Sequence, residues 1–164
     1  MNDAIRMGLV WGAALSAFMG ALIWASLKQN PLIWAGDAPP DVRARIGALD
    51  ERTKRQKRSW GVVMVVGLVA LFGSLAWRTF PLGLAPTFVA AFLCFQTFNL
   101  FDALVIDLGL VVLKPAWAFP PGTADSPSYR DVRWHLGNWL KGFAGGAVFA
   151  ALVTGVSALA RLAV

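Results

Sequence analysis

Residues 87–113 read TFVAAFLCFQTFNLFDALVIDLGLVVL and contain no basic side chain. Roughly 20 consecutive apolar residues suffice for a helix to cross a bilayer, and this segment is longer than that. Polar side chains nevertheless interrupt it at Gln96, Asn99, Asp102 and Asp107. Ionisable groups are costly inside a membrane and usually face a protein interior or a wet cavity. We therefore expect this helix to carry the functional site.

Three other apolar segments, at about residues 7–27, 59–77 and 136–160, predict further membrane-crossing helices. Only 15% of the 164 residues are charged, against about 25% in soluble domains. The mean hydropathy is +0.60, which also fits a membrane protein. The predicted fold is all-α, with four transmembrane helices in an antiparallel bundle that forms a single transmembrane domain over residues 1–164.

Basic residues are concentrated in the two long predicted loops, residues 28–58 and 114–135. The first loop contains Lys28 and seven Arg or Lys residues between positions 43 and 58, and the second contains Lys114, Arg130 and Arg133. Because basic loops stay on the cytoplasmic side, both loops are expected in the cytoplasm and both termini outside. The expected location is a cell membrane, the bacterial inner membrane, as a multi-pass protein.

The first loop also predicts a short amphipathic helix on the membrane surface, since Val42, Ile46 and Leu49 share one face and the helix leads into the basic run 52–58. Most of the net charge of +6 lies in this block beside a hydrophobic segment. Orientation and contact with membrane lipids explain such a block better than nucleic-acid binding, so no nucleic-acid partner is expected.

Small residues recur at every fourth position of the first helix: Gly8, Gly12, Ser16 and Gly20. Such a face lets a second helix approach closely in lipid, where packing drives helix association. The partner helix is expected either within the same chain or in a homo-oligomer or larger membrane complex, and the sequence leaves both open.

The start of the last helix offers a polar face that complements the third helix. Asp131, His135 and Asn138 are spaced i, i+4, i+7, with Lys141 nearby. An Asp one turn before a His can orient its imidazole ring. The candidate catalytic residues are Asp102, Asp107 and His135. The candidate ligand-binding residues are Gln96, Asn99, Tyr129, Arg130, Asp131, Arg133, Asn138 and Lys141.

Three functions remain open for this polar site. The sequence favours a scaffold or accessory subunit of a membrane complex, because polar side chains also join helices inside membranes. The second function is binding or transformation of a lipid-like amphiphile at the inner leaflet, with basic side chains on an anionic head and His135 or an Asp as general base. The third is proton or cation transport through Asp102. Whether the protein is an enzyme stays undecided.

Cofactor signals are weak. The single histidine excludes bis-His haem ligation, although His135 with Met7, Met19 or Met64 stays open. Two Asp and one His could bind a divalent cation, but no spacing requires it, so no metal is assigned and the cofactors stay unknown. The single cysteine, Cys94, excludes an internal disulfide and a CxxC motif.

One resemblance is carried by the second half of the chain. Phe101-Asp102-x-x-Val105-x-Asp107, then Pro121-Gly122-Thr123, Tyr129-x-Asp131 and His135 resemble a pattern in small uncharacterised bacterial four-helix integral membrane proteins. The resemblance implies a four-helix membrane fold and no particular activity.

Overall fold

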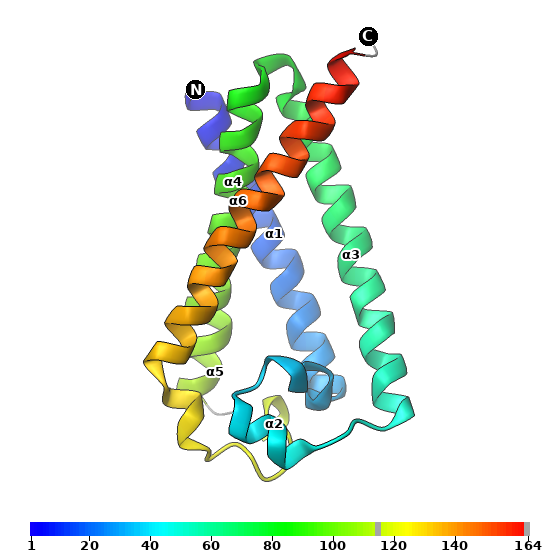
Figure 1. Cartoon of the computed structure of the whole chain (residues 1–164), viewed down its shortest axis with the longest axis vertical. Coiled ribbons are helices and arrows are strands. Elements are labelled where there is room, and N and C mark those ends of the chain that lie inside the picture. The colour runs from blue at the N-terminus through cyan, green and yellow to red at the C-terminus, as the bar shows by residue number, and fades with distance from the viewer. Residues whose placement is uncertain (114–115, 163–164) are drawn as a thin grey trace.

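The structure is a computed structural model that describes residues 1–113 and 116–162. It is all-α. The long helices are α1 (Asn2–Gln29), α3 (Glu51–Thr79), α4 (Leu84–Phe101) and α6 (Val132–Leu162), and α4 continues through a π-helical segment (Asp102–Asp107) into α5 (Leu108–Leu113). The short elements are α2 (Pro40–Ile46) and 3-10 turns at Pro31–Asp37, Phe80–Leu82, Ala116–Ala118 and Pro127–Arg130. Successive long helices run in opposite directions, with both termini at one end and both long loops at the other (Figure 1).

Four helical stretches are long and apolar enough to cross a membrane: Asn2–Gln29, Glu51–Leu82, Leu84–Leu110 and Val132–Leu162. They coincide with the four predicted spans and indicate a small multi-pass membrane protein. Each helix extends past its predicted apolar core, because the flanking polar residues are helical too. The predicted loops 28–58 and 114–135 are correspondingly shorter, since α3 begins at Glu51 and α6 at Val132.

The first loop differs from its prediction at the basic run. The short helix α2 ends at Gly47, whose φ of 68° lies in the left-handed region that glycine tolerates. A new helix then starts where the Asp50 side chain accepts a hydrogen bond from the backbone N–H of Thr53 at 2.6 Å. The basic residues 52–58 therefore belong to the first turns of α3 and not to a continuation of α2. That α2 lies on a membrane surface stays a prediction.

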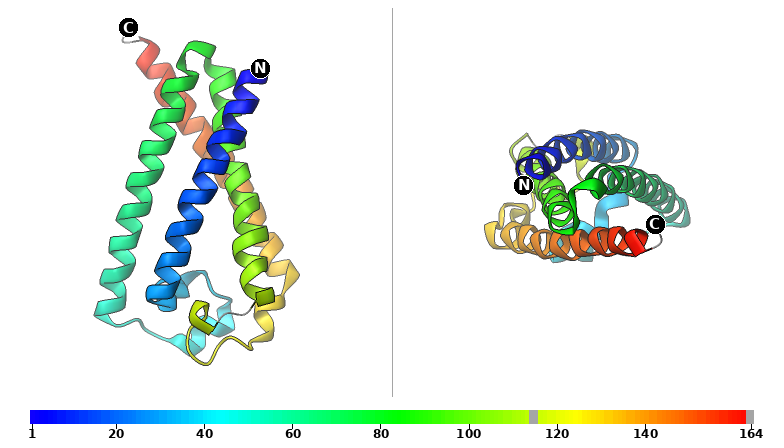
Figure 2. Two further views of the ribbon diagram at one scale, coloured as in Figure 1. Left: turned by 180° about the vertical axis from the view of Figure 1, so that it is seen from behind. Right: turned by 90° about the horizontal axis from the view of Figure 1, so that it is seen from above.

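The small-residue face of α1 packs against α4. A Cβ atom at Gly8 would lie 2.8 Å from the Ala90 carbonyl oxygen, and one at Gly12 would lie 2.9 Å from that of Cys94. Gly8, Gly12, Ser16 and Gly20 are all buried, and Figure 2 shows α1 and α4 side by side. The partner helix is thus in the same chain, and an oligomer through this face would have to displace α4.

The long helix α3 diverges from α4 and α6 toward the loop end, whereas α1 stays beside it (Figure 1). At the terminus end it is tied to α6, because the Arg161 guanidinium donates a hydrogen bond to the Phe80 carbonyl oxygen. The same guanidinium lies 4.4 Å from the centre of the Phe80 ring. At the loop end, Asn30 links the end of α1 to α3 by donating to Thr53 Oγ1 at 3.1 Å and Gln56 Oε1 at 2.8 Å.

Candidate functional site

The polar centre of the third membrane helix contains a π-helical turn over Asp102–Asp107. The backbone N–H of Leu108 bonds to the carbonyl of Ala103, five residues earlier, which is the π-helical spacing. In a regular α-helix, Asp102 and Asp107 would point about 140° apart. The wider π turn brings residues five apart closer to one side, and both carboxylates line the same cavity. π-Bulges of this kind are frequent at functional sites.

This cavity has a volume of about 710 Å³ and lies at the loop end of the bundle. The helices α1, α4 and α6 and the π-helical turn form its sides, and both loops contribute to its wall. Its apolar membrane-helix residues are Met19, Ile23, Leu27, Phe98, Ile106 and Leu110. Its polar side chains are Asp37, Arg43, Asp102, Asp107, Tyr129, Asn138 and Lys141. Five residues of the predicted site therefore come together here: Asp102, Asp107, Tyr129, Asn138 and Lys141.

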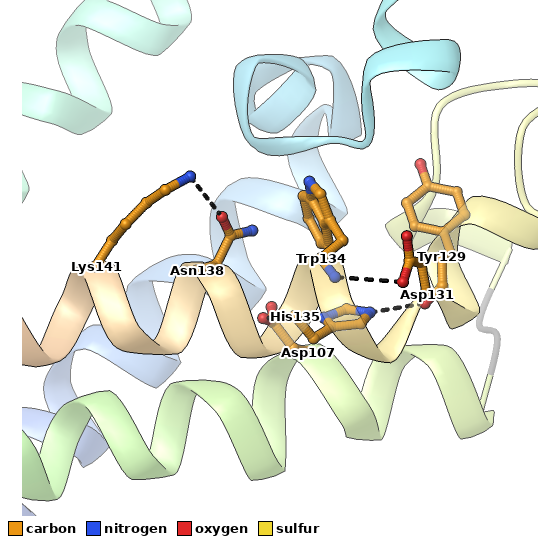
Figure 3. A network of polar contacts seen from close by, with 7 residues as sticks. All are labelled: Asp107, Tyr129, Asp131, Trp134, His135, Asn138 and Lys141. Carbon is orange, nitrogen blue, oxygen red and sulfur yellow. Dashed lines mark hydrogen bonds and ion pairs between the residues drawn. The ribbon is translucent and has the colours of Figure 1, made fainter.

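His135 does not line the cavity. It contacts Asp107, which does line the cavity (Figure 3). Its Nε2 atom lies 2.7 Å from the carbonyl oxygen of Tyr129, and its Nδ1 atom lies 3.5 Å from Asp107 Oδ2. A carbonyl oxygen only accepts hydrogen bonds, so the Nε2–H group donates to Tyr129. Nδ1 makes no hydrogen bond within the described residues, and its 3.5 Å contact with Asp107 is longer than a well-formed one. His135 therefore lies behind Asp107 at the cavity wall.

Asp131 has a different role from the one predicted. Its Oδ1 atom accepts hydrogen bonds from the backbone N–H groups of Arg133 at 2.9 Å and Trp134 at 3.3 Å. Asp131 therefore caps the start of α6, and the imidazole of His135 is held by Asp107 and the Tyr129 carbonyl instead. Capping satisfies backbone donors that the first turn of a helix leaves unpaired, which is why the carboxylate turns toward the backbone.

Gln96 and Asn99 join α4 to α6 and do not line the cavity. Gln96 Nε2 donates to the Phe143 carbonyl oxygen at 3.1 Å, and Asn99 Nδ2 donates to the Trp139 carbonyl oxygen at 3.2 Å. Gly142 makes room for the Asn99 side chain, since a Cβ atom at that position would overlap it. These two amides serve the helix seam, as polar side chains commonly do in membranes.

Two predicted basic residues, Arg130 and Arg133, are exposed and do not line the cavity. Lys114 lies outside the described residues. Among residues 1–113 and 116–162, no group of three or more His, Cys, Asp or Glu side chains is close enough to hold a metal ion. Asp102, Asp107 and His135 therefore do not form such a group.

The sequence reasoning missed the cavity residues of the first loop, including Trp34, Asp37 and Arg43. Trp34 is held against α1 because its Nε1 donates to Ser26 Oγ at 2.8 Å. Arg43 Nη1 donates to the Gly36 carbonyl oxygen at 3.5 Å. A tryptophan beside a membrane helix end was the one available signal, but its partner could not be identified without the fold.

The two loops are joined beside the cavity. Ser126 Oγ donates to Asp41 Oδ2 at 2.9 Å, and hydrogen bonds from Ser128 and Ser126 lower the pKa of the Asp41 carboxyl. On the second loop, Phe119 packs edge-on against Tyr129 with ring centres 5.0 Å apart. Burial raises the pKa of the Tyr129 hydroxyl, so it stays neutral and can donate a hydrogen bond.

This contact between the loops predicts a pH dependence. Since the pKa of Asp41 is lower in the folded protein, its stabilising effect is present above about pH 4 and is lost as the pH falls below that value. Amide hydrogen exchange in residues 119–130, corrected for intrinsic rates, should be faster at pH 3 than at pH 6. Asp41→Asn should remove this difference, and an unchanged difference in that variant would contradict the assignment.

No family model, no curated protein and no solved structure matches this chain, so its function is argued from the site alone.

Proposed function

We propose that the protein binds one lipid-like amphiphile in the cavity beside the π-helical turn. The observation that carries the proposal is the division of the cavity wall into two kinds of surface. Side chains of α1 and α4, such as Ile23 and Phe98, supply an apolar part, and charged side chains of the π turn, α6 and the first loop supply a polar part. A volume of about 710 Å³ is in the usual range of about 300–1,000 Å³ for ligand pockets.

The polar side chains suit a head group with both donors and acceptors. Asp102 and Asp107 accept hydrogen bonds when ionised, as from an ammonium or hydroxyl group, whereas Lys141 and Arg43 donate to anionic oxygens. Asn138 can do either, and in Figure 3 it lies on the same side of α6 as Lys141, whose Nζ atom is 3.4 Å from Asn138 Oδ1. Asp107, with His135 Nδ1 3.5 Å from its carboxylate, would be the general acid or base should the amphiphile be transformed.

The competing functions have less support. The Gln96 and Asn99 contacts with α6 fit a scaffold or accessory subunit of a membrane complex, but assembly alone does not require a cavity with polar walls. Proton or cation transport through Asp102 would need a path through the half of the bundle that contains the two termini. There the close contacts of Gly8 and Gly146 with α4 leave little room between the described helices.

The orientation of the site follows from the basic loops. We propose that both loops are cytoplasmic and both termini outside, in a bacterial inner membrane, because Lys and Arg are concentrated in residues 28–58. The polar end of the cavity would then lie at the inner leaflet, where the head group of a membrane lipid also lies.

Filling the cavity tests the proposal. Ile23 lines the cavity and is only 6% exposed, so Ile23→Trp should occupy space that the amphiphile needs. Leu9→Trp is the matched control, because Leu9 is on the same helix but 50% exposed on the outside of the bundle. Native mass spectrometry after release from a mild detergent should find one retained lipid on the wild type and on Leu9→Trp. On Ile23→Trp the affinity for that lipid should fall at least about tenfold, which corresponds to the loss of about 1.4 kcal/mol of binding free energy.

Thermal unfolding checks that both variants are folded. Retention of the same lipid by folded Ile23→Trp, or no retained lipid on the wild type, would contradict the proposal and leave the scaffold as the better account. If Ile23→Trp does not fold, Ile23→Phe makes the same test with a smaller side chain.

A further inference from the structure

A second concave surface lies at the loop end, between the C-terminal end of α1 and the first turns of α3. It encloses about 500 Å³. Its residues are Gln29, Arg52, Arg55, Gln56, Ser59, Trp60 and Val63, none of which lines the larger cavity. We call this surface the α1–α3 groove. It lies where hydrogen bonds from Asn30 to Gln56 and from Trp60 to Gln29 hold the end of α1 beside α3.

The groove is strongly basic. Five of the residues between positions 52 and 58 are Arg or Lys. Glu51 pairs with Lys54 at 2.7 Å, and Lys54 lies outside the groove. Arg52 and Arg55 face the groove, and neither is within ion-pair distance of a carboxylate in residues 1–113 and 116–162. The pKa of the Asp50 carboxyl is lowered by hydrogen bonds from Thr53 and, less strongly, by the charge of Arg52. Two guanidinium groups are therefore available for an anionic ligand.

The groove residues of α3 lie on one side of that helix, and the Trp60 side chain is held in place by Gln29 of α1. At about 100° per residue, Arg52, Arg55, Ser59 and Val63 fall within an arc of about 80°. Trp60 Nε1 donates to Gln29 Oε1 at 2.6 Å, which holds the indole against the end of α1. Tryptophan at this level of a membrane helix is typical of the membrane–water interface.

The groove is continuous with the outer face of α3, which is apolar. Val62, Val63 and Val66 are exposed and belong to a stretch that is apolar enough to cross a membrane. A molecule that places acyl chains on these valines brings its head group to the level of Arg52 and Arg55. A membrane phospholipid has this shape, whereas a soluble anion would gain nothing from the valines.

We propose that the α1–α3 groove binds an anionic phospholipid of the surrounding bilayer, with its phosphate between Arg52 and Arg55. Guanidinium groups bind phosphate oxygens through paired, charge-assisted hydrogen bonds. Juxtamembrane basic clusters are also attracted to anionic lipid surfaces. This site is separate from the amphiphile cavity, so the two proposals stand or fall independently.

The test compares two variants with the same loss of charge. Arg52→Gln/Arg55→Gln removes the two groove arginines. Lys54→Gln/Arg58→Gln removes two charges that do not line the groove, at about 200° and 240° around the helix from Arg52. Each protein also carries Ile23→Trp, which fills the amphiphile cavity, so that only lipid bound elsewhere is counted. It is titrated in a mild detergent with phosphatidylglycerol or phosphatidylcholine, and the bound lipid is measured by native mass spectrometry.

We expect the wild type and the Lys54/Arg58 variant to prefer phosphatidylglycerol over phosphatidylcholine, with affinities for phosphatidylglycerol within about twofold of each other. The Arg52/Arg55 variant should bind phosphatidylglycerol at least about tenfold more weakly, since the phosphate loses its charge-assisted hydrogen bonds. Arg52→Lys/Arg55→Lys keeps the charge but loses the paired hydrogen bonds of the guanidinium groups. Its affinity for phosphatidylglycerol should lie between those of the wild type and of Arg52→Gln/Arg55→Gln.

If both double-Gln variants bound phosphatidylglycerol equally weakly, the loss would reflect net charge alone, and the proposal would be overturned. The same would follow if the wild type bound the two lipids equally, or if inorganic phosphate displaced phosphatidylglycerol at equal concentration. Thermal unfolding of each variant shows whether a loss of binding reflects a loss of structure. The single Arg55→Gln variant repeats the comparison should the double variant not fold.

Discussion

Gly12→Leu is expected to lower the free energy of unfolding by about 3 kcal/mol or more, at the upper end of the cost of overpacking. A Cβ atom at Gly12 would lie 2.9 Å from the Cys94 carbonyl oxygen and equally close to Thr97 Oγ1. The first of these is backbone and cannot rotate away. The leucine must therefore push α1 from α4, and the contacts of Gly8 and Gly20 along the same face are lost with it.

The measurement is unfolding in a detergent micelle, followed by circular dichroism. Gly73→Leu is the matched control, because no atom lies within 4 Å of a Cβ atom placed at Gly73. That variant should be neutral or more stable by up to about 1 kcal/mol, since glycine is a poor helix former. Equal stability of the Gly12 and Gly73 variants would mean that α1 and α4 do not meet as described.

Asp102→Asn is expected to weaken binding of the lipid that co-purifies with the wild type by about tenfold or more and to leave the fold intact. This follows from the proposed function. Asp102 lines the cavity, and within the described part of the chain no hydrogen bond or ion pair involves its side chain. A head-group donor would then be its partner. The amide keeps the shape of the side chain but loses the charge, and a hydrogen bond to a charged group contributes about 1.5–3 kcal/mol.

Asp3→Asn is the control for the change of net charge, because Asp3 is exposed near the N-terminus, far from the cavity. Affinity is compared by titrating delipidated protein with the extracted lipid, and thermal unfolding verifies the fold. An Asp102→Asn variant with wild-type affinity would show that the head group does not touch Asp102. Lower thermal stability in Asp102→Asn alone would instead indicate a structural role for the carboxylate.

The four helices were predictable from sequence because span length and hydropathy depend on composition over some 20 residues, which local detail does not disturb. The π-helical turn could not be predicted from the sequence. A regular α-helix would point Asp102 and Asp107 about 140° apart, whereas one wider turn changes the rotation of every residue that follows. Nothing in the residue types at 102–107 distinguishes the two geometries, since packing against the rest of the bundle decides between them.

The site was predicted in part for a similar reason. The α6 residues Asn138 and Lys141 meet the third membrane helix as predicted, because helical spacing placed them on one face. Asp131 was expected to orient His135 because the two are close in sequence, but the helix terminus needs Asp131 as a cap. Asp37 ends a 3-10 turn and Arg43 lies in α2, and both line the cavity. The position of these short elements depends on contacts between residues distant in sequence, such as Ser126 with Asp41, which no periodicity predicts.

The chain's single cysteine provides a built-in chemical reporter. Cys94 is fully buried on α4, and its carbonyl oxygen faces Gly12 across the contact between α1 and α4. A water-soluble maleimide can alkylate this buried thiol only when the packing around Cys94 opens. Where closing is faster than alkylation, the labelling rate gives the free energy of that opening in native conditions, without denaturant and without an engineered probe.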